Sequence, residues 1–222
     1  MREAARRTAC HNNCRHIFIG LEGYRLEHGR FPPAYLTDKW GNPMHSWRVL
    51  ILPYIDQQEL FDRYRFDEPW DGVNNRQLLA EMPDVYRCPS HGHGETELAG
   101  VGFTNYLLLT GPESVFPGGE SLRLEEIVDG AGETALFADV NGLSVEWLRP
   151  TDLSAKAFRA NLQNPSYVSN HPGISDSLFS LTMVGMADGH VYSLSGDELT
   201  PAAIYSLTTR ANGDWVDLTK TP

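Results

Sequence analysis

The apolar and thiol positions of the first 28 residues repeat at helical spacing. They are Cys10, Cys14, Ile17, Leu21, Tyr24 and His28, separated by steps of four, three, four, three and four residues. Such steps place side chains on one face of a helix. Gly29 suits a C-terminal cap, and Pro32 and Pro33 prevent continuation. The pattern predicts a long amphipathic helix over residues 1–29.

Residues 30–90 also show mostly helical spacing, in shorter pieces. The apolar positions of one piece are Trp47, Leu50, Ile51, Tyr54 and Ile55. Pro53 should divide this piece, and further helices are expected over residues 57–64 and 73–81. Residues 37–43 contain Gly, Asn and Pro and predict a tight loop. We expect Trp40 of that loop to pack back on the first helix.

Residues 91–222 instead contain short runs typical of strands. The runs cover residues 103–109, 134–140, 178–187 and 190–194, with a closing strand expected over 215–218. Asp188 and Gly189 predict a two-residue type I′ hairpin turn. Thr200 and Pro201 predict the start of a late helix over 202–210. The order of elements predicts a single α+β domain over residues 1–222, with a helical insert at 30–90 and a β-rich region at 91–222.

Charge narrows the classes of partner. The 222 residues carry a formal net charge of −11, which disfavours binding to nucleic acid or to anionic lipid. The longest apolar run covers residues 49–52, far below the roughly 20 residues that a membrane-spanning helix needs.

Several segments together resemble a known family. They are residues 2–7 with Cys10 and Asn12-Asn13, 28–33, 46–50 with 52–54, 86–90, 104–106, and His171-Pro172-Gly173 ahead of Ala187-Asp188-Gly189. This set is similar to the prepilin-like proteins of unknown function of planctomycete-type bacteria, a family that also carries a solute-binding label. The resemblance implies a type IV pilin-like fold, with the long N-terminal helix packed on an antiparallel β-sheet.

The resemblance also implies a function and a location. We expect the soluble part of a membrane-anchored, pseudopilin-like structural or assembly subunit, serving a secretion or pilus-type system. The first helix would lack its membrane-spanning start, and the full-length protein would be anchored in the inner membrane with its domain extracytoplasmic. Expected partners are other pilin-like subunits or envelope proteins. The alternative is an extracytoplasmic module that binds a solute, a glycan or calcium.

His171, Asp188 and Gly189 form the C-terminal motif of that family. Sixteen residues separate His171 from Asp188, whereas the family typically has nine, so an insertion around residues 174–180 would lengthen the connection. An imidazole and a carboxylate held together could orient each other or bind a cation. The alternative is structural, with Asp188 and Gly189 forming the turn and His171 capping a neighbouring loop.

Other residues suggest a metal site or a disulfide. Calcium prefers oxygen ligands, and Asp139, Asn141, Asp188 and Asp129 are candidates in expected loops, without EF-hand spacing. His91 and His93 lack a third ligand and predict a surface loop. If the domain is extracytoplasmic, either Cys10 or Cys14 could bridge to Cys88. We take Cys10 and Cys88 as the candidate pair, with three free thiols as the alternative.

The sequence lacks the common catalytic motifs. The sequence contains no GxSxG, HExxH, P-loop or dinucleotide-binding glycine pattern. We therefore expect neither an enzyme nor a cofactor other than calcium. Trp40, Trp70 and Trp147 read as exposed aromatics that could stack on sugar rings, although tryptophan is more often buried.

Overall fold

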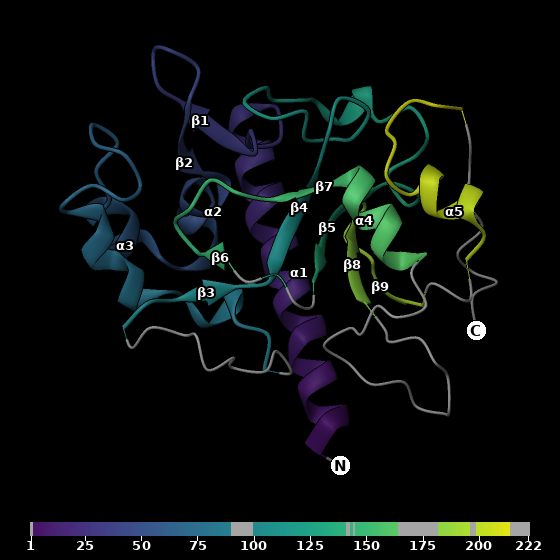
Figure 1. The fold of residues 1–222 in the computed structure, drawn as a ribbon, viewed down its shortest axis with the longest axis horizontal. Coiled ribbons are helices and arrows are strands. Elements are labelled where there is room, and N and C mark those ends of the chain that lie inside the picture. The colour runs from purple at the N-terminus through teal and green to yellow at the C-terminus, as the bar shows by residue number, and fades with distance from the viewer. Residues whose placement is uncertain are drawn as a thin grey trace.

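The computed structural model describes residues 2–89, 100–140, 143, 145–163, 182–195 and 199–213. Within these residues a five-stranded sheet lies between two layers of helices (Figure 1). Its strands, in spatial order, are β7 (Leu153–Ser154), β4 (Tyr106–Thr110), β5 (Ala135–Asp139), β8 (Thr182–Met186) and β9 (Val191–Leu194). Neighbouring strands are antiparallel except for β7, which is parallel to β4. The expected α+β class is confirmed.

Both faces of this sheet are buried. Tyr106 and Leu108 of β4 belong to the core on one side, and Leu107 and Leu109 belong to the core on the other. Every residue of β5 and of β8 is buried. Strands covered on both faces carry continuous apolar runs rather than an alternating pattern, which explains the runs in the sequence.

Helix α1 (Arg2–His28) covers one face of the sheet. Its stripe of Cys10, Cys14, Ile17 and Leu21 is completely buried, while its first turns extend beyond the sheet (Figure 1). Gly29 ends the helix with φ 74° and donates its N–H to the Arg25 carbonyl at 2.8 Å. The predicted helix and its glycine cap are confirmed.

Short elements connect α1 to the sheet. They are β1 (Tyr35–Thr37), β2 (Pro43–Ser46), α2 (Trp47–Leu50), the 3₁₀ turn η1 (Leu52–Ile55), α3 (Gln58–Arg63), η2 (Asn75–Glu81) and η3 (Asp84–Tyr86). Pro53 lies in η1, directly after α2, so it divides the segment as expected. The β1–β2 hairpin was not expected from the sequence. It replaces part of the predicted loop.

The close contact between η1 and α1 depends on two glycines of the helix. A Cβ atom at Gly20 would lie 2.8 Å from side-chain atoms of Ile51 and Ile55, and one at Gly23 would lie 2.8 Å from the Tyr54 ring. Any larger residue would push η1 away from the helix.

Two helices, α4 (Ala155–Leu162) and α5 (Pro201–Ser206), cover the other face of the sheet. Phe158 of α4 and Ile204 of α5 are buried there. Thr200 accepts a hydrogen bond from the Ala203 N–H through its side-chain oxygen, so the predicted N-cap of the late helix is confirmed. Helix α4 was not expected.

Smaller elements complete the described residues. Strands β3 (Phe103–Thr104) and β6 (Val145–Glu146) pair with each other, and the 3₁₀ turn η4 (Leu124–Glu126) precedes β5. The expected strand over residues 215–218 lies outside the described residues. None of the described helices combines the length and the apolar character of a membrane span.

The β8–β9 hairpin has a longer turn than predicted. Its loop consists of Ala187, Asp188 and Gly189, closed by hydrogen bonds from the Gly189 N–H to the Met186 carbonyl and from the Met186 N–H to the His190 carbonyl. Only Gly189 has positive φ, at 90°. The type I′ prediction is therefore wrong, because that turn needs positive φ at both central residues.

Two of the tryptophans singled out in the sequence have opposite environments. The side chain of Trp40 is 76% exposed and does not pack on α1, because the β1–β2 hairpin carries it away from the helix. Trp147, a candidate for stacking on sugar rings, is completely buried in the core beside Tyr86, which is the more usual position for a tryptophan.

Candidate functional site

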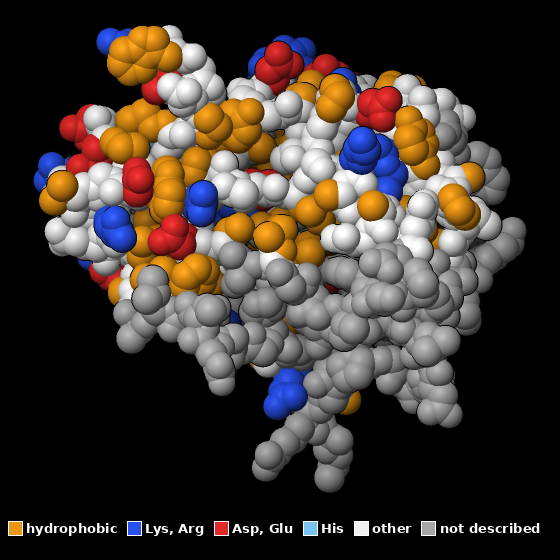
Figure 2. Space-filling model, in the orientation of Figure 1, with side chains coloured by type: hydrophobic (Ala, Val, Ile, Leu, Met, Phe, Trp, Pro, Cys, Tyr) orange, Lys and Arg blue, Asp and Glu red, His pale blue; other side chains and the backbone are white. Residues whose placement is uncertain are grey.

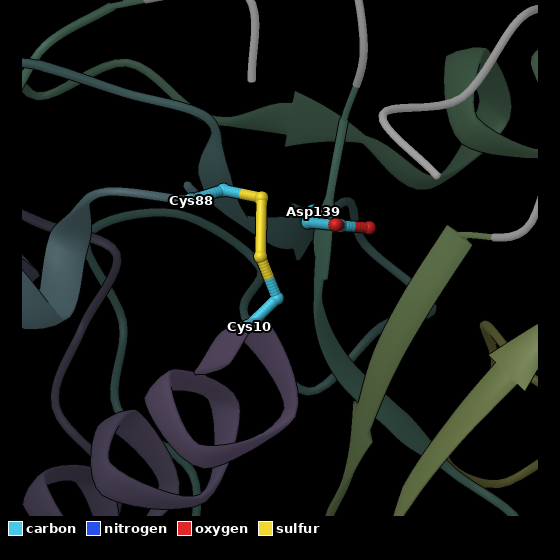
Figure 3. A group of neighbouring side chains, drawn as sticks. All are labelled: Cys10, Cys88 and Asp139. Carbon is cyan, nitrogen blue, oxygen red and sulfur yellow. A yellow bond between two sulfur atoms is a disulfide. The ribbon is translucent and has the colours of Figure 1, made fainter. Parts of the chain in front are cut away.

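A disulfide joins Cys10 of α1 to Cys88, which follows η3 (Figure 3). The two Cα atoms are 5.4 Å apart, and 78 positions separate the residues along the chain. Both side chains are buried. The bridge attaches the N-terminal half of α1 to the segment that enters the sheet.

Asp139 of β5 lies beside this disulfide. The sulfur atoms of Cys10 and Cys88 and a carboxylate oxygen of Asp139 all lie within 4.8 Å of one another. Two thiolates and a carboxylate can bind zinc, but the disulfide uses both sulfur atoms. Figure 3 shows the carboxyl group directed away from the bridge, and its Oδ1 accepts a hydrogen bond from the Met183 N–H at 2.6 Å. In the oxidised protein the Cys10–Cys88 disulfide of this cluster therefore serves as a covalent link, which we call the clamp.

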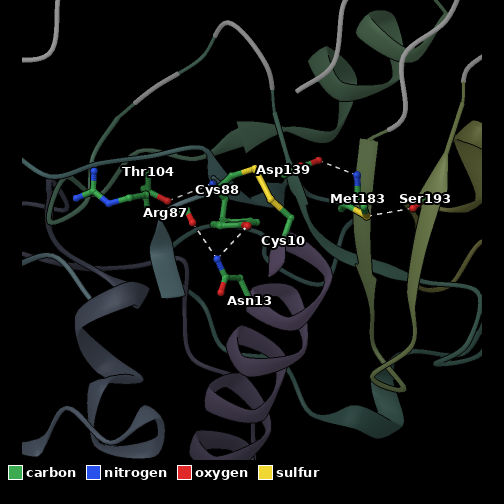
Figure 4. Close-up of a disulfide and its surroundings, with 9 residues drawn as sticks. Cys10, Asn13, Arg87, Cys88, Thr104, Asp139, Met183 and Ser193 are labelled. Atoms are coloured by element: carbon green, nitrogen blue, oxygen red, sulfur yellow. Dashed lines mark hydrogen bonds between the residues drawn. A yellow bond between two sulfur atoms is a disulfide. The ribbon is translucent and has the colours of Figure 1, made fainter. Parts of the chain in front are cut away.

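Polar contacts reinforce the clamp. Asn13, one turn along α1 from Cys10, donates its side-chain N–H to the Arg87 carbonyl at 2.8 Å and to the Tyr106 hydroxyl at 3.4 Å (Figure 4).

Cys14 is a buried free thiol. Burial raises the pKa of the Cys14 thiol well above its ordinary value, and the nearby Asp139 carboxylate raises it further by a smaller amount. A protonated thiol is a poor nucleophile, so Cys14 fills space in the core.

The structure does not bring the calcium candidates together. Asp139 is buried in a strand rather than exposed in a loop. In the antiparallel β5–β8 pair it lies near Met183, whereas Asp188 follows the other end of β8. Five residues of strand separate the two ends, roughly 15 Å. Asn141 lies outside the described residues, as do His91 and His93.

Asp188 instead organises its own turn. Its Oδ1 accepts the His190 N–H at 3.0 Å, and its Oδ2 is 2.8 Å from His190 Nδ1. Gly189 rests on α1, because a Cβ atom there would lie 2.7 Å from the Phe18 ring. The motif residues Asp188 and Gly189 thus form a turn packed against the helix. The third motif residue, His171, lies outside the described residues.

Asp129 has a similar structural role. Its two carboxylate oxygens accept hydrogen bonds from the backbone N–H groups of Asn212 and Gly213, at 2.7 to 2.8 Å. These oxygens face N–H donors, which is unsuitable for a cation. Asp129 fixes the segment that follows α5.

A buried ion pair links the insert to the sheet. Arg48 of α2 lies 2.8 Å from Asp152, and both side chains are nearly inaccessible. The same Asp152 oxygen accepts hydrogen bonds from Trp47 Nε1 and from the Leu108 N–H. Burial raises the pKa of Asp152, while Arg48 and these donors act in the opposite direction.

An open groove lies between the C-terminal end of α1 and the η1–α3 segment. We call it the aromatic groove; its volume is about 440 Å³, and its lining includes Tyr24, Glu27, His28, Tyr54, Gln58 and Phe61. The Tyr54 hydroxyl donates to Glu27 at 2.9 Å and lies 3.3 Å from His28 Nε2. Burial and the Glu27 carboxylate raise the pKa of Tyr54 to about 12, so the hydroxyl stays protonated.

A second cavity, of about 690 Å³, also has His28 in its lining. Arg30 and Arg123 line it together with Glu125 and Glu126. Its charges balance, so it does not select strongly for ligands of either sign. The aromatic groove is the more specific of the two surfaces.

Comparison with protein families decides the family of the chain. A family model described as a protein of unknown function (DUF1559) matches residues 1–171. The chain belongs to this family. The DUF1559 match covers α1, the insert and the sheet through α4, and ends before the β8–β9 hairpin. Comparison with curated proteins and with solved structures gives no match. The prepilin-like part of the resemblance stays a prediction.

Sequence reasoning missed two of these features. The Arg48–Asp152 pair joins residues 104 positions apart, and no local pattern links them. The aromatic groove combines α1 with a segment that begins about 20 residues later. The sequence signal for this groove was His28, because it places a polar side chain at the end of an otherwise apolar helical stripe.

Proposed function

We propose that this DUF1559 chain is the globular part of a pseudopilin-like structural subunit of the cell envelope. A helix that continues α1 on its N-terminal side would hold the subunit in the inner membrane. Its partners would be other pilin-like subunits or envelope proteins.

The geometry of α1 carries the proposal. From Cys10 to Leu21 one face of the helix is buried against the sheet, whereas residues 4–6 and 8 are exposed on turns that extend beyond it (Figure 1). A helix with these two parts can hold a domain at one end and an anchor at the other.

The Cys10–Cys88 disulfide supports an extracytoplasmic position. Disulfides persist in oxidising compartments and are rare in the cytosol. The bridge connects α1 to the domain covalently, so tension along the helix would be transmitted to the sheet without unfolding the junction.

The test is fractionation of the natural full-length gene product from its own cells. We expect it in the membrane fraction, retained after an alkaline wash and cut by protease added to spheroplasts. Thiol labelling under denaturing, non-reducing conditions, read by peptide mass, should label Cys14 and neither Cys10 nor Cys88, because those two are bridged.

Two controls make the result decisive. In a Cys14→Ser variant neither Cys10 nor Cys88 should be labelled. In a version directed to the cytosol, Cys10, Cys14 and Cys88 should all be labelled. Recovery of the natural product in the cytosol with these three cysteines labelled would refute the proposal.

A further inference from the structure

The loop of the β1–β2 hairpin, residues 38–42, is held rigidly. Asp38 Oδ1 accepts hydrogen bonds from the N–H groups of Trp40 and Asn42, both at 2.8 Å. The Asp38 N–H also donates to the Asn42 carbonyl at 2.9 Å, and the Gly41 N–H donates to the Asp38 carbonyl. We call this segment the Trp40 loop. Its conformation is fixed before any partner binds.

This rigid loop presents a large apolar side chain to solvent. Trp40 is 76% exposed, and Lys39 Nζ lies 4.2 Å from the centre of its ring. In Figure 2, hydrophobic and basic side chains project together where Figure 1 draws the loop of this hairpin. Tryptophan is enriched at binding hot spots, and a preformed loop loses little entropy on binding.

The aromatic groove has complementary chemistry. Tyr24, Tyr54 and Phe61 offer ring faces and edges to an indole. Glu27 is an exposed carboxylate in the lining, suited to the Lys39 ammonium. Two copies that each carry a net charge of −11 repel each other, so a contact that pairs Lys39 with Glu27 also reduces this repulsion locally.

We propose that Trp40 of one copy occupies the aromatic groove of a second copy. Lys39 then pairs with Glu27 of that copy at the edge of the contact. This inference extends the proposed function, because it assigns an assembly contact to the globular part. Its test uses the chain by itself, so its outcome is independent of membrane anchoring.

The test is analytical ultracentrifugation of the oxidised chain, from micromolar to millimolar concentration. Wild-type protein should associate reversibly as concentration rises. Trp40→Ala should weaken the association roughly 30-fold or more, as expected for a hot-spot tryptophan. Val73→Ser is the matched control, because Val73 is 80% exposed in another segment, and it should associate like wild type.

A second variant blocks the groove without removing core packing. Gln58 is exposed on α3 within the groove lining, and Gln58→Trp places an indole there. This variant should weaken the association to a similar extent. An equal mixture of Trp40→Ala and Gln58→Trp should associate, because one supplies an open groove and the other a free Trp40 loop. Circular dichroism and thermal melting confirm that each variant is folded.

Three results would overturn the proposal. The first is wild-type protein that stays monomeric over the whole range. The second is association that survives both Trp40→Ala and Gln58→Trp, which would place the contact elsewhere. The third is a monomeric protein whose tyrosine fluorescence responds equally, in wild type and in Trp40→Ala, to a saccharide panel, which would make the groove a glycan site.

Discussion

At the scale of single residues, the Arg48–Asp152 ion pair is the contact whose loss should be most costly. The two side chains are 0% and 3% exposed. Arg48 Nε and Asp152 Oδ2 have no hydrogen-bond partner among the described residues, so one donor and one acceptor of the pair stay without a hydrogen bond. Each charge depends on the other for compensation in an apolar environment.

We expect Asp152→Asn to lower the free energy of unfolding by about 3–5 kcal/mol, because it leaves the Arg48 cation buried without a carboxylate. Urea denaturation measures the loss. The double variant Arg48→Met/Asp152→Leu removes both charges and should cost less than the single variant. A double variant at least as unstable as Asp152→Asn would contradict this explanation.

The exposed Arg63–Glu81 pair is the internal control. Its side chains are 54% and 45% exposed, and a surface ion pair contributes about 1 kcal/mol or less. Glu81→Gln should therefore leave stability almost unchanged. The comparison separates the effect of burial from the effect of removing a carboxylate.

At the scale of elements, the packing of η1 on α1 favours glycine at helix positions where helix propensity alone would favour alanine. Alanine usually stabilises a helix by about 1 kcal/mol relative to glycine. At Gly20 the added Cβ would meet Ile51 and Ile55 at 2.8 Å, and both are buried. Overpacking of this kind costs about 1–3 kcal/mol, so it should outweigh the gain in propensity.

Gly20→Ala should accordingly lower the melting temperature, and Gly23→Ala should lower it as well. The Cβ at Gly23 would lie 2.8 Å from the Tyr54 Cβ as well as from the ring, and a Cβ atom moves away only with the η1 backbone. Differential scanning calorimetry of both variants checks both losses. An increase in melting temperature for Gly20→Ala would show that η1 yields easily.

The sequence predicts elements where their signals are local. Helix α1 and its Gly29 cap depend on spacing and on one residue, and the start of α5 depends on Thr200 and Pro201. The β1–β2 hairpin has only three and four residues in its strands, which is too short for a clear alternation. Helix α4 was missed although its buried positions, Ala155, Phe158 and Leu162, follow helical spacing.

At the scale of the whole molecule, contacts between distant segments were predictable only in part. The sequence left Cys10 and Cys14 open as the partner of Cys88, because both share one helical face, and the candidate pair Cys10–Cys88 is the one that the structure contains. The choice between Cys10 and Cys14 depends on which turn of α1 lies next to Cys88, the residue that follows η3. That position is set by tertiary packing, as is the separation of Asp139 from Asp188 at opposite ends of β8.

The Cys10–Cys88 bridge should determine the stability of the whole chain, since it closes a loop of 78 residues. Loss of a native disulfide in a loop of this length costs about 2–5 kcal/mol, largely because the unfolded chain gains entropy. The double variant Cys10→Ala/Cys88→Ala should therefore unfold at lower urea than the oxidised wild type. A reductant should destabilise the wild type and leave the double variant unchanged. Cys14→Ala should remain sensitive to the reductant, because Cys14 is not bridged; equal stability of oxidised and reduced wild type would show that packing of α1 alone holds the junction.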